Sequence, residues 1–321
     1  MEERLLQACL SGLALGSLYA LVAQGYYITY TTTNIVNFAQ GEFLMVGALI
    51  ALSFYLGTRL FPNPIFGLNL RTELPGGLPI LLVLVLVLAV LALMGVALER
   101  LAIRPLQTFT SVGWIMSTVG VSVLLRGAAQ LTWGPDPQRF SSPVRSLTDA
   151  LGLEPTLRPT ARTGITWHEI AVFVIAILVM AGLVLFLRRT LLGKAMVAVA
   201  FNQQAAALMG INVRRIVILT YALSAALAGL GGIMVAPIID PSPHMGLVIG
   251  LKAFAAAIIG GLENPFGILV GGLLMGVTEQ LIQNLVPGGS NWRDASVFVL
   301  IILLLAVRPT GLFGKQLVQK F

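Results

Sequence analysis

The sequence predicts an all-α, polytopic membrane protein with about eight transmembrane helices, some of them broken or re-entrant. Hydrophobic residues make up 57% of the 321 positions and charged residues only 10%, and the mean hydropathy is +0.91. Residues 79–98 are the clearest span, because they form a charge-free stretch long enough to cross a bilayer. Residues 253–262 are also charge-free but too few to cross alone, so broken helices are expected. We treat residues 1–321 as a single transmembrane domain.

The first span is predicted at residues 5–28 and is followed by a break. No charge occurs between Arg4 and Glu42, a gap of 37 residues. As one helix this gap would measure about 55 Å, whereas the hydrocarbon core of a bilayer is about 30 Å thick. Three threonines at 31–33 mark the break, because β-branched side chains are stiff and their hydroxyls compete for backbone hydrogen bonds.

A second helix is predicted at residues 38–56. Asn37 is its expected N-cap, Gln40 follows three residues later as in a capping box, and Glu42 falls in the first turn. Irregular polar backbone at membrane depth survives only when it is buried in protein or lines a watery cavity. Two interpretations stay open. The polar residues Asn34, Asn37, Gln40 and Glu42 line or support a solute path, or they form a capped loop at the membrane surface.

Charged residues are expected to end most of the other spans. The helix at 79–98 should end at Glu99, Arg100 and Arg104. The remaining predicted spans are residues 107–125, closed by Arg126; residues 170–187; residues 216–239; and residues 295–307, preceded by Trp292 and Arg293.

Three charges divide the C-terminal third, where a broken helix is expected near Gly260 and Gly261. Lys252 and Glu279 are either intramembrane charges with a function or helix-end residues that extend to water. Glu263, which precedes Asn264 and Pro265, fits the helix-end interpretation.

Small residues in the same region predict close helix contacts. Four glycines recur at helical spacing, and such glycines let transmembrane backbones approach closely. They are Gly267, Gly271, Gly272 and Gly276.

Polar segments set the expected topology. Residues 132–168 contain five prolines and are predicted to be an extracytoplasmic loop, on the same side as a loop at 59–75. Residues 99–106, residues 188–215 and the C-terminal tail hold ten of the 20 basic residues and one acid, so the positive-inside rule places them in the cytoplasm. The side of the N-terminus stays open.

Motifs for covalent chemistry are missing from the sequence. There is no Walker A motif, no serine nucleophile elbow and no cluster of histidines and cysteines that would hold a metal. The sequence pI near 10 does not indicate nucleic-acid binding, because the basic residues lie in loops beside apolar spans. Energy for active transport would therefore come from a partner or an ion gradient.

The polar segment 188–215 is the best candidate for a partner surface, although a simple connecting loop is the alternative. It is basic and lacks acids; its basic residues include Lys194, Arg214 and Arg215. The Ala-rich stretch Gln204-Ala205-Ala206 predicts a short helix that ends at Gly210, with a new start at Asn212, so that two short helices are joined at a glycine.

Several motifs together resemble the branched-chain amino-acid ABC transporter permeases, of the LivH type. They span nearly the whole chain in the order expected for that family. They are Asn37-Phe-Ala-Gln-Gly-Glu42, Glu99-Arg-Leu-Ala-Ile-Arg-Pro105, Leu192-Gly-Lys-Ala195, Leu208-Met-Gly-Ile-Asn212, Ala257-Ile-Ile-Gly-Gly-Leu262 and Arg308-Pro-Thr-Gly-Leu-Phe-Gly314.

The resemblance implies a multi-pass subunit of the bacterial inner membrane. Its partners would be a second, related permease, two cytoplasmic ATPases that bind ATP-Mg, and a periplasmic solute-binding protein. No cofactor is expected in this chain and no nucleic acid among its partners. The 188–215 segment would dock into an ATPase through a pattern similar to E-A-A-x-x-x-G, with Gln204 in place of the acid.

The resemblance leaves the solute open. Branched-chain or related amino acids are expected, with urea or short amides as alternatives. A self-sufficient secondary transporter or channel is a further alternative, and an intramembrane enzyme has little support because no nucleophile–base pair is visible.

Overall fold

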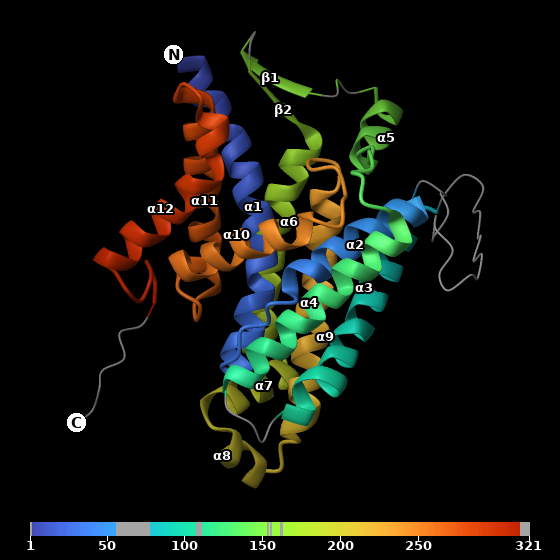
Figure 1. The fold of residues 1–321 in the computed structure, drawn as a ribbon, viewed down its shortest axis with the longest axis vertical. Coiled ribbons are helices and arrows are strands. Elements are labelled where there is room, and N and C mark those ends of the chain that lie inside the picture. Colours follow the sequence, from blue (N-terminus) through green and yellow to red (C-terminus); the bar gives the residue numbers. More distant parts are fainter. Residues whose placement is uncertain are drawn as a thin grey trace. The chain divides into compact units, whose positions relative to one another are not determined.

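The structure, a computed structural model, describes residues 2–55, 78–106, 111–152, 154, 156–160 and 163–314. Helices dominate it (Figure 1). They are α1 (Glu2–Thr33), α2 (Gln40–Tyr55), α3 (Ile80–Leu98), α4 (Ser111–Trp133), α5 (Pro143–Ala150), α6 (Trp167–Arg189), α7 (Leu191–Phe201), α8 (Gln203–Leu208), α9 (Val213–Val235), α10 (Met245–Gly260), α11 (Pro265–Leu285) and α12 (Gly289–Val307).

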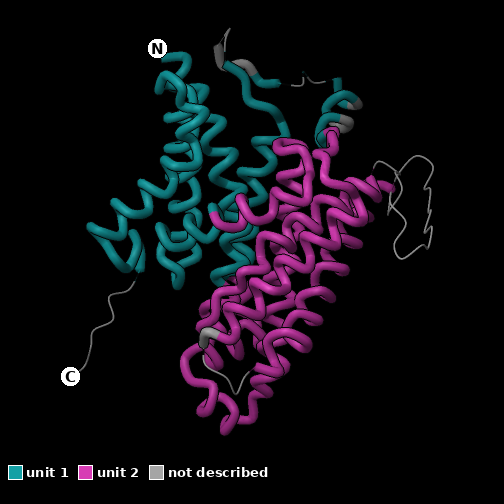
Figure 2. Tube along the Cα trace, in the orientation of Figure 1, with its two compact units in different colours: residues 1–27, 142–184, 252–321 teal, residues 28–141, 185–251 magenta. Residues whose placement is uncertain are grey.

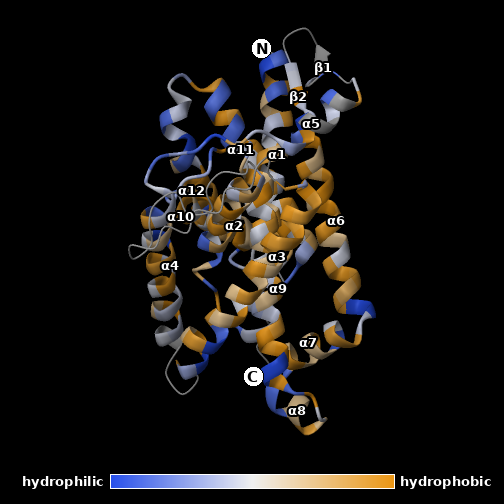
Figure 3. Ribbon diagram, turned by 90° about the vertical axis from the view of Figure 1, so that its right-hand side faces the viewer, coloured by the Kyte–Doolittle hydropathy of each residue, from blue (hydrophilic) through white to orange (hydrophobic). Residues whose placement is uncertain are grey.

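The predicted all-α membrane fold is confirmed. Within the described residues, seven helices are long and apolar enough to cross a membrane, and α2, α7 and α10 are shorter apolar helices. Figure 3 shows α3 and α6 as hydrophobic along most of their length. The predicted loop at 59–75 lies outside the described residues.

The chain forms two compact units, each built from separate stretches of sequence (Figure 2). Unit 1 comprises residues 1–27, 142–184 and 252–321, and unit 2 comprises residues 28–141 and 185–251. Helices α1, α6 and α10 each contribute residues to both units.

The break after the first helix begins just past the three threonines that are predicted to mark it, because α1 continues beyond the predicted end at residue 28 and includes them. Helix α1 ends at Thr33, whose hydroxyl donates to the Thr29 carbonyl at 2.7 Å, and α2 begins at Gln40. Asn34 between them adopts the left-handed conformation, with φ of 56°. The Asn37 carboxamide oxygen accepts the Ala39 N–H at 3.1 Å, so Asn37 caps the turn that leads into α2, three residues before the helix starts. The predicted capping box is wrong, because the Gln40 side chain bonds to helix α9 instead.

Three predicted span ends are also wrong. Helix α3 continues past Leu98 through a π-helical turn (Glu99–Ile103) and a 3-10 turn (Arg104–Leu106). Arg126 lies inside α4 and Arg293 inside α12, so neither ends its helix. Each of these two cations pairs with a buried carboxylate of another helix and therefore does not need to reach water.

In unit 1, glycines bring α1 and α11 into backbone contact. A Cβ added to Gly12 would lie 2.6 Å from the Val277 Cα, and one added to Gly272 would lie 2.7 Å from the Gly16 carbonyl oxygen. Such close approach is typical of small-residue interfaces between transmembrane helices.

The predicted break at Gly260 and Gly261 separates α10 from α11. Gly261 has a φ of +94°, which favours glycine, and Asn264 caps α11 through the Gly267 N–H at 3.2 Å. A Cβ on Gly271 would lie 2.6 Å from the Gly260 nitrogen, so the two helices touch at this end. Helix α10 has 16 residues, whereas the predicted charge-free segment has ten, because the helix runs through Lys252.

In unit 2, α9 packs against α2 and α3. Gly229 of α9 meets α2 at Gly47, where an added Cβ would lie 2.7 Å from the Gly229 Cα. This contact holds the first half of α2, and thus its polar N-terminal turn, against α9.

The proline-rich region 132–168 contains more regular structure than a loop. It forms α5 and a two-stranded antiparallel hairpin of β1 (Thr156–Thr160) and β2 (Thr163–Thr166). The Gln7 side chain of α1 ties down this hairpin by donating to the Gly164 carbonyl at 3.1 Å and accepting its N–H at 2.9 Å.

Candidate functional site

A buried carboxylate stands in the first turn of α2, in unit 2. The Glu42 residue is only 1% exposed. Its Oε1 accepts hydrogen bonds from the guanidinium of Arg126 and from the Ser122 hydroxyl at 3.1 Å, both on α4. Because Glu42 is buried, loss of Arg126 would leave its carboxylate as an uncompensated buried charge, which is strongly destabilising.

The second oxygen of Glu42 faces the start of α10. This oxygen, Oε2, has no hydrogen-bond partner among the residues that the structure describes. A Cβ added to Gly246, in the first turn of α10, would lie 2.5 Å from it. The glycine therefore leaves room for the carboxylate beside a helix N-terminus, where negative charge is favoured.

The polar residues that precede Glu42 are buried as well. Gln40 exchanges two hydrogen bonds with Ser224 of α9: its amide donates to the Ser224 carbonyl at 3.0 Å, and its oxygen accepts the Ser224 hydroxyl at 2.9 Å. Asn37 is 1% exposed, and its side-chain nitrogen has no partner within the described part of the chain. Asn34 is exposed. The segment thus holds one unpaired donor and one unpaired acceptor, on Asn37 and Glu42.

Gly246→Ala should disturb this site more than its single methyl group suggests. The new Cβ would press on the Glu42 carboxylate and lie 2.8 Å from the Gly41 carbonyl oxygen, so either the carboxylate or the α2 backbone must move. In a transporter of the kind that the resemblance implies, we expect solute uptake to fall up to about a hundredfold while the protein is still inserted, since a displacement of about 1 Å can have an effect of this size. Gly120→Ala in α4 is the control, because nothing lies within 4 Å of a Cβ there. Equal uptake by the two variants would contradict a role for the Glu42 site.

Unit 1 contains a second group of charges, centred on the buried Glu279 of α11. Its Oε2 accepts the Tyr19 hydroxyl at 2.9 Å, and its Oε1 accepts Lys252 Nζ at 2.8 Å and the Arg293 guanidinium. Lys252 also pairs with Asp294 at 2.6 Å. Two cations thus balance two carboxylates on α10, α11 and α12, and Tyr19 adds α1 to the group. We call these five residues the Glu279 cluster.

The structure decides between the two interpretations of Lys252 and Glu279 that the sequence leaves open. Lys252 and Glu279 lie inside helices and are almost completely buried, so they do not extend to water from helix ends. Glu263, in contrast, is exposed between α10 and α11. Pattern reasoning missed the partners Arg126, Arg293 and Asp294, although a charge inside an otherwise apolar run was a usable signal.

Comparison with known proteins identifies the family. Residues 8–307 match the family described as "Branched-chain amino acid transport system / permease component". The chain belongs to this family. It is 32% identical over 320 residues to the high-affinity branched-chain amino acid transport system permease protein BraD of Pseudomonas aeruginosa, which covers 98% of this chain and 97% of the relative. The corresponding LivH protein of Escherichia coli K12 is 30% identical over 316 residues, 98% of this chain and 97% of the relative.

A probable branched-chain amino acid transport permease protein LivH of Methanocaldococcus jannaschii is 31% identical over 307 residues, which cover 93% of this chain and 89% of the relative. No solved structure matches the chain. The protein is thus a permease subunit of an ABC importer and a multi-pass protein of the bacterial inner membrane.

The 188–215 segment of the permease folds into α7 and α8. The two helices meet at Asn202, whose side-chain oxygen accepts the Ala205 N–H at 2.9 Å. The predicted helix end at Gly210 and new start at Asn212 correspond to the junction between α8 and α9. Gly210 follows α8 with a φ of +84° and Asn212 caps α9. Ala206 is buried; the other predicted coupling residues are exposed, namely Lys194, Gln204, Ala205, Gly210, Arg214 and Arg215.

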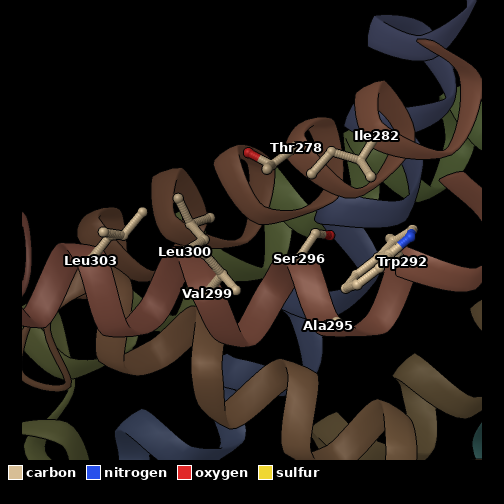
Figure 4. A pocket seen from close by; sticks show the side chains of 8 residues that line it. All are labelled: Thr278, Ile282, Trp292, Ala295, Ser296, Val299, Leu300 and Leu303. Atoms are coloured by element: carbon tan, nitrogen blue, oxygen red, sulfur yellow. The ribbon is translucent and has the colours of Figure 1, made fainter. Parts of the chain in front are cut away.

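A shallow groove between α11 and α12 of the permease is not a suitable solute site. It has a volume of about 380 Å³, and Figure 4 shows Ile282, Val299, Leu300 and Leu303 among its lining side chains. Its lining is almost wholly apolar, with the hydroxyls of Thr278 and Ser296 as minor exceptions. Because a zwitterion needs charged or strongly polar partners, we place the candidate site at Glu42 instead.

Proposed function

We propose that this permease subunit passes a small zwitterionic amino acid of the branched-chain class through the membrane by alternating access. The observation that carries the proposal is the similarity, over 98% of the chain, to relatives named as branched-chain amino acid permeases. Urea and short amides remain alternative solutes.

Residues Asn37 to Glu42 supply the polar groups that such a solute requires. An amino acid presents an ammonium group, which suits the unpaired Oε2 of Glu42, and a carboxylate, which suits the unpaired amide of Asn37. Gln40 and Asn34 support this stretch of the path, Gln40 through its bonds to Ser224. Lys252 and Glu279 have each other and further partners, which favours a role in joining helices over one in contacting the solute.

The partners in this proposal are a second homologous permease, two cytoplasmic ATPases with ATP-Mg and a periplasmic solute-binding protein. The 188–215 segment supports the ATPase contact, because it leaves large apolar side chains uncovered. Phe201 is 94% exposed, Leu208 89% and Met209 83%. With basic neighbours and no acid in the segment, these side chains fit a groove that is apolar at its centre and acidic at its rim.

Purification of the tagged chain from its native membrane, followed by mass spectrometry, tests the assembly. We expect ATPases and a second permease to be recovered with it. The recovered complex, in vesicles that contain ATP, should take up labelled leucine, isoleucine or valine supplied with the solute-binding protein. Uptake of urea or acetamide instead would favour the amide alternative. Uptake by the chain alone, sensitive to ionophores, would show a secondary transporter and refute the proposal.

Gly210→Pro should uncouple ATP hydrolysis from uptake. Proline fixes φ near −65°, whereas Gly210 has a φ of +84° and donates its N–H to the Ala207 carbonyl at 3.0 Å. The end of α8 must therefore rearrange, and with it the uncovered side chains of Leu208 and Met209. We expect uptake per ATP hydrolysed to fall at least about tenfold, a usual size for coupling between sites.

Gly210→Asn is the matched control for this change. Asparagine tolerates the left-handed conformation and keeps the N–H, so coupling should be largely retained. Normal coupling in the proline variant would remove the support for this segment as the ATPase contact.

A further inference from the structure

A polar stripe runs along α4 towards the buried Glu42 carboxylate. Polar side chains recur there at every fourth residue of a mainly apolar helix, and residues four apart lie on the same helix face. They are Thr118, Ser122, Arg126 and Gln130. Thr118 and Ser122 are buried, whereas Arg126 and Gln130 are partly exposed. The stripe therefore connects the interior of unit 2 with the end of α4 that leads into the 132–168 region.

The exposed end of this stripe meets the segment that precedes α10. The side-chain nitrogen of Gln130 lies 3.1 Å from Nε2 of the exposed His244, within hydrogen-bond distance. The Gln138 N–H, just after α4, donates to the Pro241 carbonyl at 2.9 Å. Two residues after His244 comes Gly246, which leaves room for the buried carboxylate. The segment thus borders both the exposed end of the stripe and its buried end.

Arg126 uses only part of its guanidinium in the ion pair with Glu42. Its Nη2 donates to Glu42 Oε1, whereas its Nε is buried and has no hydrogen-bond partner among the residues that the structure describes. Buried donors in proteins are nearly always satisfied, so the free Nε–H needs an acceptor that the described chain does not supply. The Arg126 side chain as a whole is 22% exposed, so it is not sealed from the exposed end of the stripe.

We propose that Arg126 binds the carboxylate of an α-amino acid while its partner Glu42 binds the ammonium group. This inference rests on the proposed function and names the ionised solute that the same site selects. The two unpaired atoms, Arg126 Nε and Glu42 Oε2, belong to one ion pair, just as the two charged groups of an α-amino acid are attached to one carbon atom.

Charge matching distinguishes the α-amino acid from the alternative solutes. A zwitterion brings one charge of each sign to a pair that is itself neutral, so the occupied site stays neutral and each ionised group has a partner. Urea and short amides carry no ionised group and gain nothing from this matching. Arg126 thereby adds a charged donor to the neutral amide of Asn37, and hydrogen bonds between ionised groups are the stronger kind.

The shape of arginine suits two contacts at once. Its planar guanidinium presents five N–H donors in a fixed fork, so one edge holds Glu42 while another is free for a solute carboxylate. Ser122 donates to the same Oε1 of Glu42 at 3.1 Å, which leaves Oε2 for the ammonium group. A lysine in place of Arg126 would still neutralise Glu42, but as a point charge it lacks the second edge. Arg126→Lys therefore separates charge compensation from solute binding.

Solute binding to the purified complex without its solute-binding protein, measured by saturation-transfer NMR in nanodiscs, tests the assignment. Leucine is compared with leucinamide, which has a neutral amide in place of the carboxylate. The wild-type complex should bind leucine at least about tenfold more tightly, because hydrogen bonds to charged groups have effects of this size. In Arg126→Lys this preference should be largely lost through weaker binding of leucine. Arg189→Lys, which changes an exposed arginine of the same unit outside the stripe, should keep it.

An unchanged preference for leucine in Arg126→Lys would show that Arg126 only neutralises Glu42, and would overturn the inference. Equal binding of leucine and leucinamide by the wild-type complex would do the same. If the lysine variant does not fold, the double variant Glu42→Gln/Arg126→Gln replaces the pair by neutral amides of similar shape and leaves no buried charge. It should bind leucine no more tightly than leucinamide, and a retained preference would refute the assignment. A wild-type complex that takes up urea or acetamide but not leucine would instead overturn the proposed function, and the inference with it.

Discussion

Replacement of Gly276 by valine should be among the most destabilising changes in this protein. A Cβ at Gly276 would overlap backbone atoms of α1, namely the Gly12 oxygen and the Gly16 nitrogen and Cα. Backbone atoms of a packed helix cannot turn aside as a flexible side chain can, so α1 and α11 must separate along their length. Overpacking of this kind costs about 3 kcal/mol, and the loss of close backbone contact between the helices adds to it.

Denaturation of the purified protein in detergent measures this effect, with Gly182→Val as the matched control. Gly182 lies in α6 of the same unit, and nothing lies within 4 Å of a Cβ added there. The control should therefore unfold like the wild-type protein, although it carries the same substitution in a transmembrane helix. Equal stability of the two variants would show that α1 and α11 are not in backbone contact.

Glu279→Ala should also destabilise the protein strongly, and more than Lys252→Ala does. The loss of Glu279 removes the acceptor for three donors, and it leaves Arg293 without a carboxylate while Lys252 keeps Asp294. The loss of Lys252 leaves Glu279 paired with Arg293 and hydrogen-bonded to Tyr19. Removal of one partner from a buried charge group costs about 3–5 kcal/mol, so we expect Glu279→Ala in this range and Lys252→Ala clearly below it.

The exposed acid Glu263 provides the control for this series. Glu263→Ala in the same unit should leave the free energy of unfolding within about 0.5 kcal/mol of the wild-type value. If Lys252→Ala proved as damaging as Glu279→Ala, Glu279 would not be the centre of the cluster.

The sequence predicts most of the helices but places several of their ends wrongly. Helix α4 runs past Arg126, and α12 begins before Trp292 and Arg293. The rule that a charge ends a span fails here because each arginine finds a carboxylate in the protein interior. The partner of Arg126 is 84 residues away in the chain, and no local pattern reveals a pairing at that distance.

The candidate site likewise combines residues that the sequence reveals with residues whose roles only the structure reveals. Asn37, Gln40 and Glu42 are recognisable because polar residues interrupt an apolar stretch, whereas Ser122, Ser224 and Gly246 are ordinary residues of apolar helices in the sequence. Their roles depend on which helices touch. Gly246 matters only because its missing side chain leaves room for the Glu42 carboxylate.

The sequence by itself determined the membrane class, the all-α fold, the presence of breaks beside the threonines at 31–33 and near Gly260 and Gly261, and the family. These features follow from quantities that run along the chain: hydropathy, the length of a charge-free stretch against the thickness of a bilayer, and local backbone preference. Only the tertiary structure decided which charges are buried in pairs and which polar atoms of Asn37, Glu42 and Glu99 are left unpaired. The reason is that the energy of a buried charge depends on its neighbours in space, and those neighbours come from helices far apart in the sequence.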